Sequence, residues 1–169
     1  SFSDDISKAS LGLAAINSLN EIDESQTIDV NAGDLLLKHG QNKNVSVIGH
    51  FPFTDALKKV AKNLWVIEKR SIEGDYPEHS AKEFLPISDI IAISSTTLIN
   101  HTLQELLELC PQNSLKMLLG PTTPMSEVIF DFGIDIISGS KVTDLNTALK
   151  HISEGSNFRQ LKRTGSIKL

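Results

Sequence analysis

Five short apolar runs, each ending in small, polar, glycine or proline residues, constrain the fold of this 169-residue chain most strongly. Between them lie stretches with helical spacing of apolar residues. Short continuous apolar runs are typical of strands buried on both faces, and their alternation with helices predicts a parallel sheet with helices on both sides. Because parallel strands run in one direction, the loops after them gather at one edge, where such sheets bind ligands. The runs are residues 45–49, 64–68, 90–95, 117–121 and 134–139.

Two strand orders fit this succession of elements. Three strands, a longer crossover and two further strands favour the order 3-2-1-4-5 of a nucleotide-binding sheet. The flavodoxin-like order 2-1-3-4-5 fits as well, because strand content does not specify which strands are neighbours. The prediction is a doubly wound α/β domain with five mainly parallel strands, and the first order is favoured.

The bulk composition describes an acidic globular domain. A chain with 40% hydrophobic residues at this length can bury one sizeable core. Its net charge of −5 gives no electrostatic reason to bind nucleic acid or an anionic membrane. No apolar run approaches the roughly 20 residues that span a bilayer, and the first residues lack a signal-peptide pattern. We therefore expect a cytoplasmic protein whose partner is a small molecule or a metal ligand.

The chain divides into three expected segments. Residues 1–26 contain an amphipathic helix over 4–20 and a polar linker. Residues 27–155 form the main domain, with helices expected at 32–38, 53–62, 97–109, 125–131 and 142–153, and a long connection over 69–88. Residues 156–169 form a basic tail without strong patterning.

The first two strand ends carry a glycine and a carboxylate. Gly49 permits a tight turn before the next helix, but the full G-x-G-x-x-G pattern that grips a pyrophosphate is missing. Glu68 ends the second strand, where nucleotide-binding sheets place a carboxylate on a ribose. The alternative is that Glu68 leaves the sheet for solvent or pairs with Lys69 or Arg70.

Hydroxyl groups follow the third and fourth strands. We expect one of Ser95, Thr96 and Thr97 to cap the next helix and the others to face the crevice. Asn100 offers a donor and an acceptor for a planar polar ligand. The loop Gly120, Pro121, Thr122 and Thr123 presents two hydroxyls on a stiff backbone, although a purely structural turn explains its prolines equally well.

Three histidines fall on the first three loops. Together with two carboxylates they could ligate a divalent or heavy metal ion, although no Cys-x-x-Cys or paired-histidine spacing specifies a metal. The alternative is that they are ordinary surface and turn residues. The candidate ligands are His50, Glu68, Asp75, His79 and His101.

Several motifs, taken together and in order, resemble the putative heavy-metal chelation family, a group of uncharacterised prokaryotic proteins. They are GLAAIN (12–17), IGHFP (48–52), Glu68 with GDYP (74–77), LPISD (85–89), SSTTLINHTL (94–103) and LGPTTP (119–124). The positions that match the family pattern are Asn17, Gly49, Glu68, Asp75, Pro77, Thr97, Asn100, Gly120 and Pro121.

The resemblance implies a Rossmann-like domain that follows a smaller domain similar to the amino-terminal domain of enolase, with a ligand site near the cleft between them. It also implies that this chain starts at about the last helix of the smaller domain. Helix 4–20 would then pair with that domain or with another chain, as in a homo-oligomer. The resemblance supplies no catalytic residue.

Three functions are consistent with the sequence. The first is a small-molecule or metal-complex binding domain with its ligand over Gly49, Glu68, 95–100 and 120–123. The second is a transferase-like enzyme that uses a nucleotide or S-adenosylmethionine, with Glu68 on the ribose. The third is an interaction subunit that docks through helix 4–20.

Overall fold

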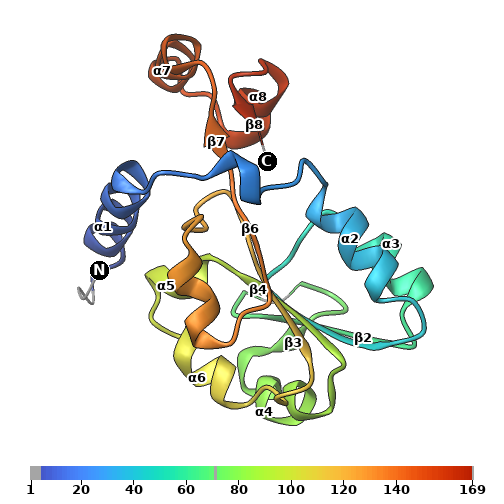
Figure 1. Cartoon of the computed structure of the whole chain (residues 1–169). Coiled ribbons are helices and arrows are strands. Elements are labelled where there is room, and N and C mark those ends of the chain that lie inside the picture. Colours follow the sequence, from blue (N-terminus) through green and yellow to red (C-terminus); the bar gives the residue numbers. More distant parts are fainter. Residues whose placement is uncertain (1–4, 71, 169) are drawn as a thin grey trace.

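A six-stranded, fully parallel sheet forms the centre of the protein in a computed structural model that describes residues 5–70 and 72–168 (Figure 1). The strands are β1 (Asn44–Ile48), β2 (Asn63–Glu68), β3 (Tyr76–Pro77), β4 (Ile90–Ser94), β5 (Leu115–Leu119) and β6 (Ile136–Ser138). Their order across the sheet is β3-β2-β1-β4-β5-β6. The predicted α/β class with a mainly parallel sheet is confirmed.

Numbered along the chain, the strands follow the favoured pattern 3-2-1-4-5, extended by a sixth strand. The five strands that the sequence predicted are themselves arranged as 2-1-3-4-5, the flavodoxin-like alternative. The third place is taken by the two-residue strand β3, which lies in the long connection after β2 and pairs with Ile67 and Glu68. The apolar run at 90–94, which the sequence counted as the third strand, is β4 and pairs with β1 from the other side. An exposed two-residue strand has no apolar run, so periodicity does not reveal it.

Helices cover both faces of the sheet. On one face α2 (Ala32–His39) and α3 (Thr54–Val60) pack through Leu36 and Leu57 on Val47 and Met117. On the other face α4 (Ala81–Phe84) and α6 (Leu103–Glu108) belong to a second core cluster. Because successive strand residues point to opposite faces, covering both faces requires apolar residues at every position, as β4 shows.

Several expected helices are shorter than predicted. The expected helix 97–109 is split into α5 (Thr96–Ile99) and α6, because His101 between them has a left-handed φ of 61° that no α-helix accommodates. The expected helix 125–131 is the 3₁₀ helix η4 (Glu127–Phe132), which ends at Gly133 with φ 80°. The connection 69–88 contains the expected short helix, α4, between η2 (Glu78–Ser80) and η3 (Leu85–Ile87).

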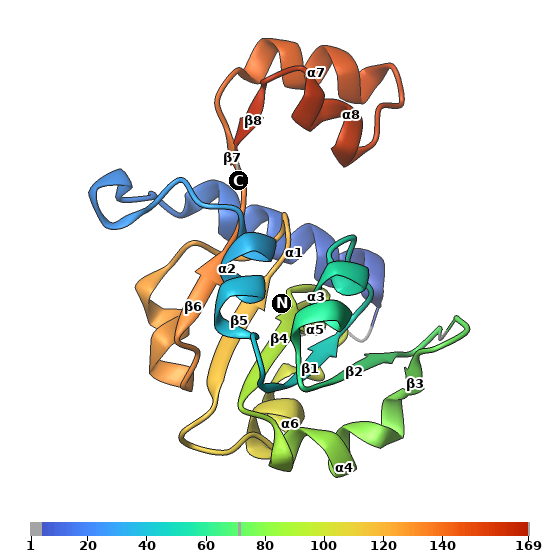
Figure 2. The same cartoon turned by 90° about the vertical axis from the view of Figure 1, so that its right-hand side faces the viewer.

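The chain after β6 forms a small unit that stands apart from the sheet (Figure 2). We call residues 141–168 the C-terminal unit. It consists of β7 (Lys141–Val142), α7 (Leu145–Ser153), α8 (Phe158–Arg163) and β8 (Ile167–Lys168), and β7 pairs with β8 in an antiparallel ribbon. The expected helix 142–153 begins three residues later, and the expected tail contains a helix and a strand. The division into three segments stays a prediction.

Helix α1 (Ile6–Leu19) lies against the loops at the carboxyl edge of the sheet. Asp5 caps it through hydrogen bonds from the backbone of Ser7 and Lys8; Asp4, which the prediction included, lies outside the described residues. Ala9 and Leu13 are its buried residues. Residues 20–31, which we call the arm, connect α1 to α2 and contain η1 (Glu24–Gln26).

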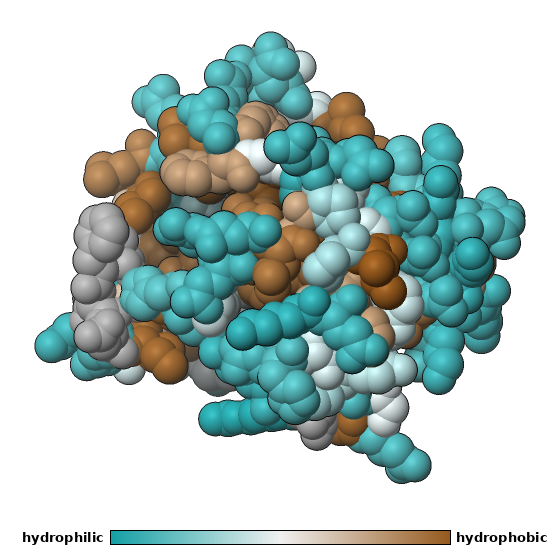
Figure 3. All heavy atoms as spheres, turned by 90° about the horizontal axis from the view of Figure 1, so that it is seen from below, coloured by the Kyte–Doolittle hydropathy of each residue, from teal (hydrophilic) through white to brown (hydrophobic). Residues whose placement is uncertain are grey.

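Apolar side chains also reach the surface. Seen from below, they form patches among hydrophilic side chains (Figure 3). Among the described residues, no helix is long and apolar enough to cross a membrane.

Candidate functional site at the carboxyl edge of the sheet

The crevice lies where the strand order changes direction. From β1 the chain continues through α3 to β2 on one side, whereas β4 lies on the other side. Loops diverge at such a point and leave room for a ligand. A cavity of about 70 Å³ lies there, lined at its polar positions by Gly49, Glu68, Lys69, Glu78, Ser94, Thr96, Thr97, Asn100 and Thr102.

Gly49 lets the first loop approach its neighbour closely. Its φ is +103°, and a Cβ atom placed there would lie 3.0 Å from Cβ of Ser94. Its backbone N–H donates to the carbonyl of Ile67 at 2.9 Å. A side chain at this position would combine backbone strain with a close contact at the cavity wall.

The hydroxyls after β4 bind one another and the backbone, which corrects the expected helix cap. Ser95 is the N-cap of α5, but its side chain makes no capping hydrogen bond. Ser94 Oγ and Thr96 Oγ1 are 2.8 Å apart, and Thr97 Oγ1 donates back to the carbonyl of Ser94 at 2.7 Å. Ser95 Oγ lies 2.9 Å from Thr122 Oγ1. The hydroxyls therefore fix the shape of this loop.

Glu68 and Asn100 contribute the carboxylate and the amide of the cavity. The Oε1 atom of Glu68 accepts a hydrogen bond from the backbone of Arg70 at 3.3 Å. Lys69 pairs with Glu78 at 3.0 Å instead of with Glu68, and no ion pair within the described residues includes Glu68. Asn100 Oδ1 accepts from the hydroxyl of Thr102 at 2.7 Å, which fixes the orientation of the amide. Nothing in the sequence pattern indicated the Lys69–Glu78 pair at the cavity.

The loop after β5 packs beside the cavity instead of lining it. Gly120 has a φ of +142°, and a Cβ atom there would lie 2.4 Å from Ser95 Oγ. The hydroxyl of Thr123 is bonded to the carbonyl of Gly120 at 2.9 Å, and the carbonyl of Pro121 accepts from Ser140 Oγ at 2.9 Å. Gly120, Pro121, Thr122 and Thr123 do not line the cavity, and neither does Ser95, which is buried against Thr122.

Asn17, which the family resemblance marked, holds α1 on this loop. Its Nδ2 donates to the carbonyl of Thr122 at 2.9 Å, across 105 residues of chain. Its Oδ1 atom is buried and has no hydrogen-bond partner within the described part of the chain. Asn20 makes a similar bond of 2.7 Å to the carbonyl of Met125. Two asparagines thus fix the first helix at the carboxyl edge.

The structure brings together only two of the five candidate metal ligands. His50 Nδ1 lies 3.3 Å from Asp75 Oδ2, whose side chain is 5% exposed. Asp75 also accepts a bond from the backbone of Ile72 at 3.3 Å. Across residues 5–70 and 72–168, no three histidine, cysteine, aspartate or glutamate side chains form a group that could hold a metal ion. Glu68, His79 and His101 thus complete no centre with this pair.

Comparison with known proteins gives a consistent result. The model of the putative heavy-metal chelation family matches residues 31–169. An uncharacterised protein of Methanocaldococcus jannaschii is 31% identical over 165 residues, which are 94% of this chain and 64% of that protein. A crystal structure of a protein of unknown function from the same family, from Desulfitobacterium hafniense, is 30% identical with a TM-score of 0.81, over 92% of this chain and 65% of that one.

A second crystal structure, from Pyrococcus horikoshii, shares the fold with a TM-score of 0.84 at 24% identity, and covers 99% of this chain and 69% of its own. The chain spans about two thirds of the length of these relatives. The motif order, the sheet and the matched residues agree, and the chain belongs to the putative heavy-metal chelation family.

Proposed function

We propose that this domain binds a small polar ligand, either a metal complex or a molecule that chelates metal, in the cavity at the ends of β1, β2 and β4. The observation that carries the proposal is the meeting of Gly49, Glu68, Thr96 and Asn100 around one cavity at the strand-order switch. These residues offer one carboxylate, one hydroxyl, an amide and backbone groups.

The size of the cavity limits what enters it. About 70 Å³ corresponds to only about two water molecules at the volume that water has in the liquid. The cavity therefore receives one polar end of a ligand, while the remainder lies over the loops outside.

The side chains favour a metal that arrives with its own ligands. Protein sites for zinc and similar ions use three or four histidine, cysteine or carboxylate ligands. The described residues contain no such group of three, and Glu68 is the only carboxylate at the cavity outside the Lys69–Glu78 pair. A chelate would need only one or two contacts from the protein.

Calorimetric titration tests the proposal. Protein purified without a tag is titrated with Ni²⁺, Co²⁺ and Zn²⁺ as free ions and as their citrate and histidine complexes, with the free chelators as well. We expect binding of a complex or chelator, and a loss of at least tenfold in affinity in Glu68→Gln. The matched control is Glu105→Gln, because Glu105 is exposed on α6 outside the cavity. Equal affinities of the two variants, or no heat with any titrant, would contradict the proposal.

A nucleotide-using enzyme is the second candidate. It is favoured by one observation: Glu68 ends β2 and lines the same cavity as Gly49, which is where a ribose carboxylate lies in nucleotide-binding sheets. A thermal-shift panel of adenine nucleotides and S-adenosylmethionine tests it, since a ligand at 100 times its Kd adds about 2.7 kcal/mol of stability. A shift that disappears in Glu68→Gln would support this function, and no shift across the panel would exclude it.

The interaction function, the cytoplasmic location and a homo-oligomer remain proposals. Helix α1 already packs on its own molecule through Ala9 and Leu13 and through Asn17, which leaves Leu11 and Leu19 exposed for a partner. Sedimentation of the chain distinguishes a monomer from an oligomer. A Leu11→Gln variant that changes the oligomeric state would support docking through α1.

A further inference from the structure

A second cavity lies beyond the last strand of the sheet. It has a volume of about 280 Å³ and is enclosed by the arm, the end of β6 and the β7–β8 ribbon. This is close to the lower limit of about 300 Å³ for small-molecule sites, which suits a ligand the size of an amino acid. One wall is apolar and consists of Ile22, Ile28, Val30, Leu35, Met125 and Ile136.

Two lysines stand side by side in the lining of the same cavity. Lys141 and Lys168 are directly opposed in the antiparallel β7–β8 register, and both line the cavity. Directly opposed residues lie on the same face of a ribbon with Cβ atoms about 5 Å apart, and like charges in this position destabilise the pairing. An anion between the two ammonium groups offsets that cost.

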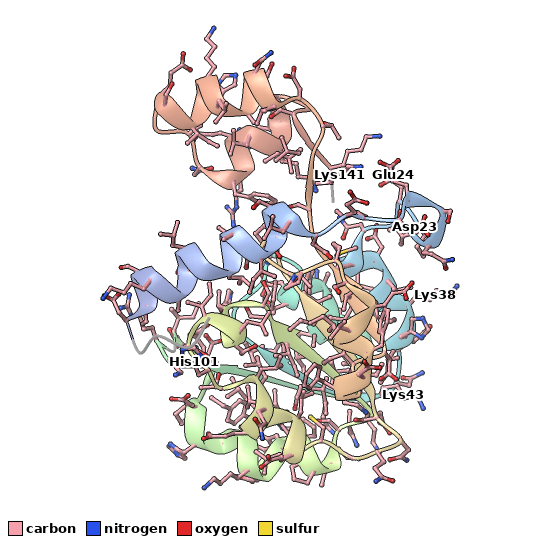
Figure 4. All side chains as sticks on the ribbon, turned by 60° about the vertical axis from the view of Figure 1, so that its left-hand side comes forward. Asp23, Glu24, Lys38, Lys43, His101 and Lys141 are labelled. Atoms are coloured by element: carbon pink, nitrogen blue, oxygen red, sulfur yellow. The ribbon has the colours of Figure 1, made fainter. Side chains whose placement is uncertain are left out.

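Glu24 of the arm supplies an anion in this structure. Its carboxylate forms an ion pair with Lys141, and the two side chains point toward each other (Figure 4). The hydrogen bond and charge of Lys141, with a smaller contribution from Lys168, lower the pKa of Glu24. The Lys141 side chain is 45% exposed although it is paired with Glu24, and Lys168 is exposed as well. The lysine pair thus already attracts a carboxylate.

Asp29 places a second carboxylate at the same cavity. The cavity is therefore lined by two ammonium groups and two carboxylates next to an apolar wall. A ligand with only a negative charge would meet Glu24 and Asp29, and one with only a positive charge would meet both lysines. A zwitterion presents an opposite charge to each group.

We infer that this cavity is a binding site for a free apolar α-amino acid. The carboxylate of the ligand lies at Lys141 and Lys168, its ammonium group lies at Asp29 and Glu24, and its side chain packs on the apolar wall. This site is separate from the cavity at the strand-order switch, and its ligand does not depend on the function proposed for that cavity.

Titration of ¹⁵N-labelled protein, followed by amide chemical shifts, tests the inference. The probes are L-leucine, 4-methylpentanoate, which lacks the ammonium group, 3-methylbutylamine, which lacks the carboxylate, and glycine, which lacks the apolar side chain. We expect leucine to shift amides of the arm and of residues 138–141 with a Kd of about 1 mM or tighter. Each of the other probes should bind at least tenfold more weakly.

Variants separate recognition from general charge effects. Lys168→Gln should weaken leucine binding at least tenfold, whereas Lys43→Gln should not change it, because Lys43 lies far from the cavity (Figure 4). Asp29→Asn should weaken the binding of leucine but not that of 4-methylpentanoate. Because Asp29 lies in the arm, this variant still tests the inference if Lys168→Gln unfolds the β7–β8 ribbon. Three results would overturn the inference: no arm shifts with leucine, equal binding of 4-methylpentanoate, or equal losses in Lys168→Gln and Lys43→Gln.

Discussion

The sheet domain and the C-terminal unit are held together by different interactions. In the sheet domain, large side chains such as Leu36, Ile91 and Leu118 are completely buried in two clusters. In the C-terminal unit the buried apolar side chains are Ala148 and Leu161, whereas Leu145 and Leu149 are 64% and 54% exposed. Burial of apolar area is thus concentrated in the sheet domain.

Hydrogen bonds at helix ends take a larger share in the C-terminal unit. Asn157 and Gln160 form a reciprocal capping box at α8, and Asp144 caps α7 through the backbone of Thr147. The hydroxyls of Thr164, the C-cap of α8, and Ser166 lie 2.6 Å apart. Individual caps contribute only about 1 kcal/mol, so we expect the unit to open at a lower free energy than the sheet.

The largest effect expected from this comparison is the truncation of matched leucines. Leu118→Ala removes a fully buried side chain between the sheet and its helices and should cost about 2–5 kcal/mol of unfolding free energy. Leu149→Ala, in the unit, should change it by less than about 0.5 kcal/mol, because that side chain is half exposed. Urea unfolding of both variants measures the difference, and similar costs would show that the two regions do not differ in burial.

Matched glycines sharpen the comparison at the loops. Gly120→Ala should cost about 3 kcal/mol, because φ +142° and the contact of the new Cβ with Ser95 Oγ both oppose it. Gly155→Ala in the unit should cost about 1 kcal/mol, because φ is +79° and no atom lies within 4 Å. Combined with Gly120→Ala, the substitution Ser95→Ala should recover part of the lost stability. Combined with Gly155→Ala, it should recover none. Thermal unfolding of the four variants checks this, and no recovery would contradict the contact.

Removal of a cap should affect the C-terminal unit alone. Asn157→Ala breaks both bonds of the capping box and should lower the protection of α8 amides by about 1 kcal/mol in hydrogen exchange. The protection of β4 and β5 amides should not change. If all amides lost protection together, the unit and the sheet would unfold as a single cooperative body.

The smallest effect on stability near neutral pH is expected from the ionisation of Cys110, just after α6. Burial raises the pKa of its thiol to about 11, against a small opposing influence of Lys116. Alkylation at pH 8 should therefore be about 100-fold slower than in unfolded protein, because the thiolate is the reacting form. The pKa of the thiol is higher in the folded protein than in the unfolded protein. The stability that this difference contributes is therefore complete below pH 9 and is lost as the pH rises toward 11. Equal alkylation rates in the two states would contradict the burial.

Part of the candidate site could be predicted from sequence. Gly49, Glu68, Thr96, Thr97 and Asn100 line the cavity, because each follows an apolar strand and parallel strands end at one edge. His50 with Asp75, and the loop after β5, lie outside it. The order of the strands decides which strand ends lie together, and contacts between distant segments decide which side chains close a cavity. Neither is a local property of the sequence.

The sequence by itself determined the α/β class and the family, because apolar runs, helical spacing and loop motifs are local patterns that any fold of the chain must satisfy. Only the tertiary structure decided that β3 takes the edge of the sheet, that Asn17 reaches Thr122, and that Lys141, opposed to Lys168, pairs with Glu24 at the second cavity. These pairings join segments far apart in the chain, and their free energy comes from contacts that exist only once the chain has folded.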